Sequence, residues 1–136
     1  MADANLFEIK GTFLTCYEDE KIDEEIRNNT FRFDENLFLS PEGEIANFVN
    51  HSCEPNTKIV KNNNKLFLVA ILDIHKGEEL VFDYSTILAS DDVWTMKCNC
   101  GTLNCRTIVK KFINLPKQIK EKYMAHRIVP SYIIGL

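Results

Sequence analysis

The sequence lacks long apolar runs, an excess of basic residues and low-complexity tracts, and each absence excludes a class of protein. No run of about 18 apolar residues occurs, which argues against a membrane-spanning helix and a membrane partner. The 20 acidic residues outnumber the 16 lysines and arginines, which argues against direct nucleic-acid binding through a general basic face. The opening segment "MADANLFEIK" has no basic start or long apolar stretch, so we expect no secretory signal. We therefore expect an intracellular protein, cytoplasmic or nuclear.

The residues that are present suit one small, mainly β domain. A chain of 136 residues with 45% apolar content can bury one core. Strands are predicted over residues 6–15 with a break at Gly11, over a hairpin at 31–39, over 57–60 and 65–72, and over 79–84. Helices are predicted over residues 18–27 and 116–124, with one helical turn within 44–49. The apolar tail "RIVPSYIIGL" is expected to dock on the rest of the chain.

Four of the five cysteines fall into a pattern that indicates a metal site. Cys98, Cys100 and Cys105 lie within eight residues of one another in "CNCGTLNC", and Cys53 lies upstream in "NHSCEPN". A structural zinc ion takes four tetrahedral ligands, mostly thiolates, so three sulfurs leave one position for a distant residue. Cys53 is the expected fourth ligand, whereas Cys16 stands alone and is expected to pack as a small apolar residue.

Other interpretations of the cluster stay open at this point. His51, two residues before Cys53, is an alternative fourth ligand. The cysteines are also compatible with unpaired core residues or with a disulfide, although a C-x-C spacing is too short to pair comfortably with itself. A disulfide would also need an oxidising compartment.

Two further motifs precede the cysteine cluster in a fixed order. "NFVNHSCEPN" occupies residues 47–56 and "KGEELVFDY" occupies residues 76–84. Alternation places Leu80, Phe82 and Tyr84 on one face of a strand, and alone this is typical of a core stripe. Together with the C-x-C-x4-C that follows, the ordered set resembles the SET domain family of protein lysine methyltransferases with a zinc-binding post-SET segment. The C-terminal tail is similar to that of small bacterial members.

The resemblance implies a fold, a reaction and a set of site residues. The fold is one of small β-sheets around a pseudoknot, with residues 1–90 as an N-terminally shortened SET domain and 91–136 as the post-SET zinc segment and C-terminal helix. The reaction uses S-adenosyl-L-methionine as methyl donor and a lysine of a protein, such as a histone-like protein, as acceptor. Zinc is implied as the metal on the four cysteines. The implied roles are catalytic for Tyr84 and Phe82, cofactor-binding for Asn50, His51 and Tyr84, and substrate-channel for Phe82 and Trp94.

The sequence departs from the family pattern in its first part. The family usually carries a G-x-G turn whose glycines let the backbone approach the methyl donor, and no G-x-G occurs here. Asn47 also stands where the family often has arginine. We therefore expect an incomplete donor pocket and an exposed sheet edge that can pair with a second chain as a homodimer. The alternative function is a catalytically weak SET-like module that binds a basic protein tail or a partner subunit.

Overall fold

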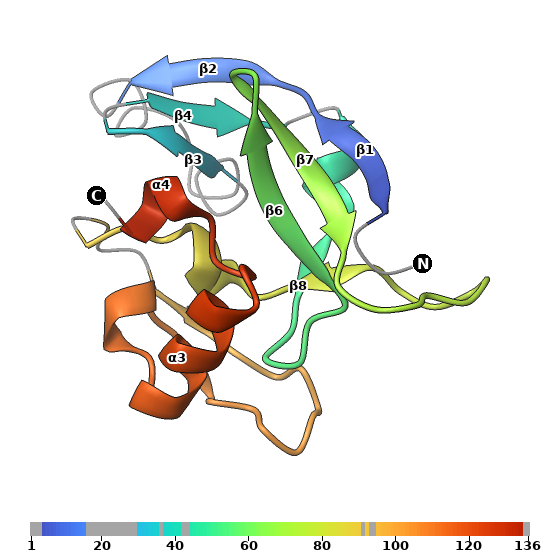
Figure 1. Cartoon of the computed structure of the whole chain (residues 1–136), viewed down its shortest axis with the longest axis vertical. Coiled ribbons are helices and arrows are strands. Elements are labelled where there is room, and N and C mark those ends of the chain that lie inside the picture. The colour runs from blue at the N-terminus through green and yellow to red at the C-terminus, as the bar shows by residue number, and fades with distance from the viewer. Residues whose placement is uncertain are drawn as a thin grey trace.

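The chain folds into several small antiparallel sheets that face one another, with short helices at the C-terminal end (Figure 1). The computed structural model describes residues 4–15, 30–35, 37–41, 44–90, 92 and 95–134. One sheet has the strand order β1-β7-β6 and another the order β2-β4-β3. Two-stranded pairs are formed by β5 with β8 and by β9 with β10. The predicted mainly β class is confirmed.

The first sheet is built on a tight hairpin of β6 (Thr57–Asn62) and β7 (Lys65–Ala70). Asn63 and Asn64 connect the strands with φ values of 52° and 60°. Asparagine tolerates this left-handed conformation better than most residues, which is why the "KNNNK" pattern predicts the turn. β1 (Asn5–Ile9) pairs with the other side of β7 and forms the edge of the sheet among the described strands.

The second sheet confirms the hairpin predicted over residues 31–39. β3 (Phe31–Asp34) and β4 (Leu37–Ser40) pair antiparallel, and β2 (Thr12–Thr15) pairs with the other side of β4. The break predicted at Gly11 separates β1 from β2. A Cβ atom at Gly11 would lie 1.9 Å from the carbonyl oxygen of Ser40, the last residue of β4. Only glycine therefore permits the backbone to approach the end of β4 so closely.

The two motif segments meet in a short parallel pair. β5 (Asn50–His51) pairs with β8 (Val81–Phe82), and the Ser52 N–H donates to the Phe82 carbonyl at 3.1 Å. The helical turn expected before β5 is the 3-10 helix η1 (Ile45–Phe48). This parallel pairing brings together residues some thirty positions apart, as the family resemblance implies.

The strand predicted over residues 79–84 is too long. Only Val81 and Phe82 are in strand, and Tyr84 begins the 3-10 helix η2 (Tyr84–Ile87). The Asn56 side chain accepts the Val81 N–H at 2.9 Å, and the Asp83 side chain accepts the Ser85 N–H at 3.0 Å. Side chains therefore satisfy backbone groups that a longer strand would have paired, and the chain turns at Asp83.

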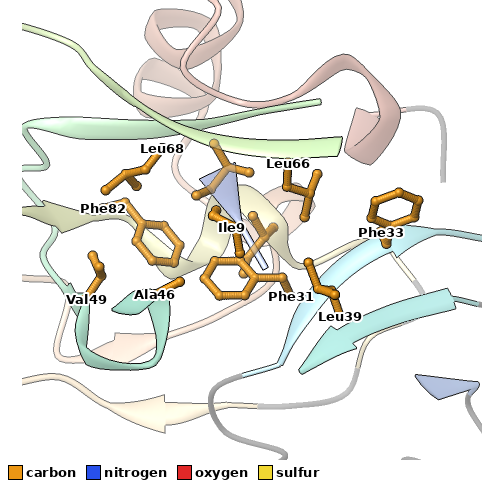
Figure 2. Close-up of a cluster of buried hydrophobic side chains, with 11 residues drawn as sticks. Ile9, Phe31, Phe33, Leu39, Ala46, Val49, Leu66, Leu68 and Phe82 are labelled. Atoms are coloured by element: carbon orange, nitrogen blue, oxygen red, sulfur yellow. The ribbon is translucent and has the colours of Figure 1, made fainter. Parts of the chain in front are cut away.

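The core of the β-rich part lies between the two three-stranded sheets (Figure 2). It includes Ile9, Phe31, Leu66, Leu68 and Phe82, each at most 3% exposed. Leu80 and Tyr84 pack against the same cluster, so the alternation predicted for this motif places all three of its apolar side chains on the core. Phe82 is therefore a core residue of this cluster.

The C-terminal part forms a second apolar cluster around a helix. α3 (Lys117–Ala125) follows Pro116, and α4 (Ser131–Ile134) lies in the tail. Tyr123, Ile128, Val129 and Ile133 are buried in this cluster, which confirms that the apolar tail docks. The remaining elements are η3 (Phe112–Asn114), β9 (Met96–Lys97) and β10 (Ile108–Val109). The helix expected over residues 18–27, as well as Cys16 and Trp94, lies outside the described residues.

Candidate active site and metal centre

Tyr84 lies where the two motif segments meet. Its hydroxyl donates to the Val49 carbonyl at 2.8 Å, and its backbone N–H donates to His51 Nδ1 at 2.9 Å. Its ring lies against Phe82, with centroids 4.8 Å apart. Burial, with a smaller contribution from the Glu79 carboxylate, raises the pKa of Tyr84 to about 12. The hydroxyl therefore stays protonated at neutral pH and has one fixed direction.

His51 points toward the cysteines. Its side chain is 3% exposed, and its Nε2 lies 3.5 Å from Cys53 Sγ. Burial lowers the pKa of His51, and the Arg106 charge lowers it further against the opposing effect of Asp83. Because Nδ1 accepts the Tyr84 N–H, the neutral ring carries its proton on Nε2, facing the sulfur. The side chain thus connects Cys53 with Tyr84.

Phe82 and Asn50 lie on different sides of the same strand pair. Phe82 is 2% exposed and stacks on Phe31, with centroids 5.6 Å apart. Asn50 is exposed, and its amide nitrogen donates to the Glu79 carboxylate at 2.9 Å. A donor molecule that used the Asn50 amide would have to compete with Glu79 for it.

The structure brings four cysteines together. Ligand atoms of Cys53, Cys98, Cys100 and Cys105 all lie within 4.8 Å of one another, and all four cysteines are free thiols. β9 and β10 pair beside the cluster, and the Cys98 N–H donates to the Thr107 carbonyl at 2.7 Å. The four sulfurs form this group, so the cysteine set predicted from the sequence is assembled by the fold, and His51 lies next to it.

The spacing of the sulfurs fits a tetrahedral metal. Cys98 Sγ lies 3.8 Å from Cys53 Sγ and 3.7 Å from Cys105 Sγ. Four thiolates about 2.3 Å from a central zinc would be separated by about 3.8 Å, whereas a disulfide holds its sulfurs at about 2.0 Å. Burial raises the pKa of the Cys98 thiol to about 12, so without a cation this cluster would hold a buried neutral thiol. The residues therefore fit zinc.

Sequence reasoning missed a buried ionic network beside the site. The Asp83 carboxylate accepts hydrogen bonds from Arg106 Nη2 and from the Tyr123 hydroxyl, both at 2.7 Å. Asp83 directly precedes Tyr84, and Arg106 directly follows Cys105. The available signal was that Asp83 and Arg106 carry opposite charges next to two of the motif residues. The spacing of these residues in the sequence did not show that the two charges meet.

The comparison with protein families decides the identity of the fold. The family model described as SET domain matches residues 2–85, which is more than half of the chain. The chain belongs to the SET domain family. The resemblance drawn from the three motifs is therefore confirmed, and so is the expected fold of small sheets with a cysteine cluster that could hold a metal.

Relatives of this SET domain include large histone methyltransferases. The chain is 39% identical over 82 residues to the H3 lysine-4 specific histone-lysine N-methyltransferase of Saccharomyces cerevisiae, covering 56% of this chain and 8% of that protein. The same-named protein of Cryptococcus neoformans is 35% identical over 82 residues, with 56% of this chain and 6% of that protein covered. The chain thus spans less than a tenth of the length of these relatives.

A solved structure supports the same fold. The crystal structure of KRYPTONITE in complex with mCHH DNA, an H3(1-15) peptide and SAH superposes with a TM-score of 0.59 and 25% identity. The match covers 80% of this chain and 25% of that one.

Among the described residues of the SET domain chain, no helix is long and apolar enough to cross a membrane.

Proposed function

We propose that this SET domain is a protein-lysine N-methyltransferase that uses S-adenosyl-L-methionine and modifies a lysine of a histone-like protein. The observation that carries the proposal is the Tyr84 hydroxyl, held on the Val49 carbonyl at the junction of β5 and β8. The histone H3 activity named for the relatives supports the substrate class. A division into a SET domain over residues 1–90 and a post-SET segment over 91–136 belongs to the same proposal.

The reaction requires a neutral amine placed in line with a methyl group. A lysine has an ordinary pKa near 10.4, so its deprotonation at pH 7 costs about 4–5 kcal/mol. Removal of the lysine from water into an apolar channel beside Phe82 and Tyr84 would disfavour the ammonium form and lower that pKa. The lone pair then forms the new C–N bond as the C–S bond of S-adenosylmethionine breaks and S-adenosylhomocysteine leaves. Because one bond forms as another breaks, positioning supplies much of the rate.

The residues of this chain have distinct roles in that positioning. Tyr84 orients the amine and the methyl group through its protonated hydroxyl. Asn50 and the His51 backbone bind the methyl donor, and Phe82 lines the channel for the lysine. Trp94, which lies outside the described residues, stays a predicted channel residue. Among the residues that line this site, Tyr84 is the one for which we propose direct contact with the reacting atoms.

Zinc is proposed as the metal of the four-cysteine cluster. Cys53, Cys98, Cys100 and Cys105 would hold it, and it would supply cross-linking of a segment that buries little apolar surface of its own. The cluster joins the NHSC segment to residues 98–105, and Tyr84 packs against the buried residues around it. Its role is structural, because four thiolates leave no open coordination position.

Calorimetry and a transfer assay test the proposal together. The zinc-loaded chain is titrated with S-adenosylmethionine and S-adenosylhomocysteine and is then incubated with a histone H3 peptide. We expect micromolar binding, about −8 kcal/mol, and a mass increase on a lysine of the peptide. Donor binding without transfer would point to another lysine substrate. The absence of both would favour the alternative, a SET-like module that binds a basic tail or a partner subunit.

Phe82 makes a prediction about the product. A phenylalanine leaves out the hydroxyl that would hold a water molecule or the amine, so we predict di- or trimethylation. Phe82→Tyr should shift the product toward monomethyl-lysine at a small loss of stability, since a hydroxyl enters a core position that is 2% exposed. Mass spectrometry of the peptide at long reaction times reads the product. Only monomethyl product from the unaltered chain would contradict the assignment.

The exposed edge strands support a proposal about the oligomeric state. Leu6 of β1 is 38% exposed and Phe13 of β2 is 50% exposed, and edge strands with apolar residues invite pairing with another chain. We predict a homodimer, which sedimentation equilibrium would detect, and we expect Phe13→Lys to weaken it.

The proposed substrate also suggests a cellular location. With a histone-like substrate, the protein would act in the nucleus or, before histone import, in the cytoplasm.

A further inference from the structure

A buried carboxylate directly before Tyr84 is held by two distant parts of the chain. The side chain of Asp83 has no solvent exposure. It accepts hydrogen bonds from Arg106 Nη2 at 2.7 Å and from the Tyr123 hydroxyl at 2.7 Å. A buried charge persists only when it is paired and hydrogen-bonded, so the place of Asp83 depends on both partners.

Asp83 in turn fixes the backbone at Tyr84. It is the N-cap residue of η2, and its side chain accepts the Ser85 N–H at 3.0 Å. The Tyr84 N–H is held by His51 Nδ1 at 2.9 Å. Successive backbone N–H groups are thus bound to two buried side chains, so a shift of Asp83 moves the first residue of η2, which is Tyr84.

Arg106 joins this arrangement to the cysteine cluster. Its backbone N–H donates to Cys53 Sγ at 3.4 Å, while its guanidinium pairs with Asp83. Its Nε and Nη1 are buried without a hydrogen-bond partner among the described residues, so Nη2 holds the guanidinium in place, through Asp83 at 2.7 Å and the Ser85 hydroxyl at 3.3 Å. One residue therefore contacts a proposed zinc ligand with its main chain and the neighbour of Tyr84 with its side chain.

The cysteine segment comprises residues 96–110, which carry Cys98, Cys100 and Cys105. We propose that Arg106 and Asp83 are positioning residues through which the zinc-bound cysteine segment and helix α3 set the location of the Tyr84 hydroxyl. The inference rests on the proposed methyl transfer for its effect on rate, but the positional link itself is a property of the fold. Methyl transfer then depends on an intact cysteine segment even though no cysteine touches the reacting atoms. Tyr123 contributes the link to α3, since it bonds the same carboxylate.

Kinetics of zinc-loaded variants test the link. Arg106→Met removes the cation, Arg106→Lys keeps a cation beside Asp83, and Lys110→Met removes an exposed cation from the same segment as a control. With one zinc per chain verified for each, we expect kcat for an H3 peptide to fall on the order of 10²-fold in Arg106→Met, because small displacements of an aligned group have effects of this size. The KM for S-adenosylmethionine should change far less than kcat. Arg106→Lys should recover part of the loss, and Lys110→Met should match the unaltered chain.

Fluorine NMR gives a readout that does not need methyl transfer. The chain is labelled with 3-fluorotyrosine, and Tyr84→Phe assigns the Tyr84 resonance. We expect that resonance to move in zinc-loaded Arg106→Met and to stay in place in Lys110→Met. If the unaltered chain neither binds the donor nor transfers a methyl group, the proposed function fails, and the fluorine shift alone decides the positional link.

Two results would overturn the inference. The first is a zinc-loaded Arg106→Met chain that melts at a lower temperature but keeps its kcat and its Tyr84 resonance, since Arg106 would then only stabilise the fold. If that variant does not fold, Tyr123→Phe replaces it, because it removes one hydrogen bond to Asp83 and keeps the ion pair. A smaller fall in kcat with a moved Tyr84 resonance is expected there. The second overturning result is no change in either measurement for Tyr123→Phe.

Discussion

At the scale of single residues, Tyr84 and Tyr132 make hydrogen bonds of the same kind in different places. The Tyr84 hydroxyl donates to the Val49 carbonyl at 2.8 Å, and the Tyr132 hydroxyl donates to the Arg32 carbonyl at 2.6 Å. Both rings are partly buried against the same core cluster. The two tyrosines are therefore matched in their hydrogen bonding and burial. Tyr84 lies at the proposed reaction site, whereas Tyr132 connects α4 to β3.

Tyr84→Phe should abolish most methyl transfer while leaving the fold intact. Loss of the positioned hydroxyl is expected to lower kcat on the order of 10²-fold. Each Tyr→Phe change removes one hydrogen bond, which contributes about 1 kcal/mol to the free energy of unfolding. Tyr132→Phe should therefore show a similar fall in stability with unchanged kcat. Methyl-transfer rates and thermal melts of both variants check this, and equal rates for the two would contradict the role of Tyr84.

His51 illustrates what the residue scale hides from sequence reasoning. A histidine beside a cysteine suggests a fourth metal ligand as readily as a donor-binding residue. In the structure its Nδ1 is committed to the Tyr84 N–H, and its Nε2 faces Cys53. Its side chain thus links the cysteine cluster to Tyr84, a role fixed by the direction of the ring, which no one-dimensional pattern encodes.

At the scale of elements, the cysteine segment has little apolar core of its own. β9 and β10 are each two residues long, and Leu103 between them is fully exposed. The cluster around Cys53 and Cys98 is small, with Val109 as its fully buried apolar residue. Such a segment buries too little apolar surface to fold alone, which is the situation in which a structural metal is used.

Removing one cysteine ligand should release zinc and loosen this segment. We expect Cys100→Ser to lower bound zinc below one ion per chain and to lower the melting temperature, because three thiolates hold zinc more weakly than four. Elemental analysis of protein purified without chelator measures the zinc. Cys16→Ser is the control, since Cys16 stands apart from the clustered motif in the sequence and should leave the zinc content unchanged. No zinc in the unaltered chain would refute the metal site.

The β6–β7 turn offers a prediction that concerns the fold alone. Asn64 has φ of 60°, so Asn64→Ala places a Cβ in a conformation that alanine adopts poorly and should destabilise the fold by about 1 kcal/mol. Asn64→Gly should be neutral or stabilising, because glycine adopts this conformation freely. Denaturant unfolding measures both. The exposed Asn62→Ala at the end of β6 is the control, and a loss there equal to that of Asn64→Ala would show that the turn conformation is not the cause.

At the scale of the whole molecule, two tyrosines connect the C-terminal part to the β-rich part. Tyr123 bonds Asp83 from α3, and Tyr132 bonds Arg32 across 100 positions of sequence. Burial raises the pKa of Tyr132, and burial together with the Asp83 charge raises the pKa of Tyr123, both above the ordinary value of 10.0. The folded state thus binds these phenolic protons more tightly than the unfolded state.

The zinc-loaded chain should therefore lose stability as pH rises above about 10, where unfolded tyrosine begins to ionise. Below that pH both states keep the proton and the stabilisation is fully present. Above it, each such tyrosine lowers the free energy of unfolding by about 1.4 kcal/mol per pH unit until its folded-state pKa is reached. Unfolding curves between pH 8 and 11 measure the slope. Tyr132→Phe should reduce the slope by one proton, and an unchanged slope would contradict the assignment.

The sequence by itself determined the local structure and the list of chemical groups. Alternating apolar residues in 31–39 and 57–72 specify hairpins because the side chains of a strand alternate between faces, and "KNNNK" specifies the turn between β6 and β7. The three ordered motifs identified the family, and the cysteine spacing identified the set of four sulfurs. Each of these depends on neighbours within a few residues or on the identity of a residue.

Only the tertiary structure decided how those groups meet. The strand expected over residues 79–84 is limited to Val81–Phe82, because Asn56 from another segment takes the N–H of Val81 at its start and Asp83 caps η2 directly after its end. The parallel pairing of β5 with β8 and the Asp83–Arg106 ion pair join residues about thirty and twenty positions apart. Such contacts form when burial of a shared core excludes water and leaves polar groups no other partners. That is a property of the packed chain, and short-range patterns in the sequence do not contain it.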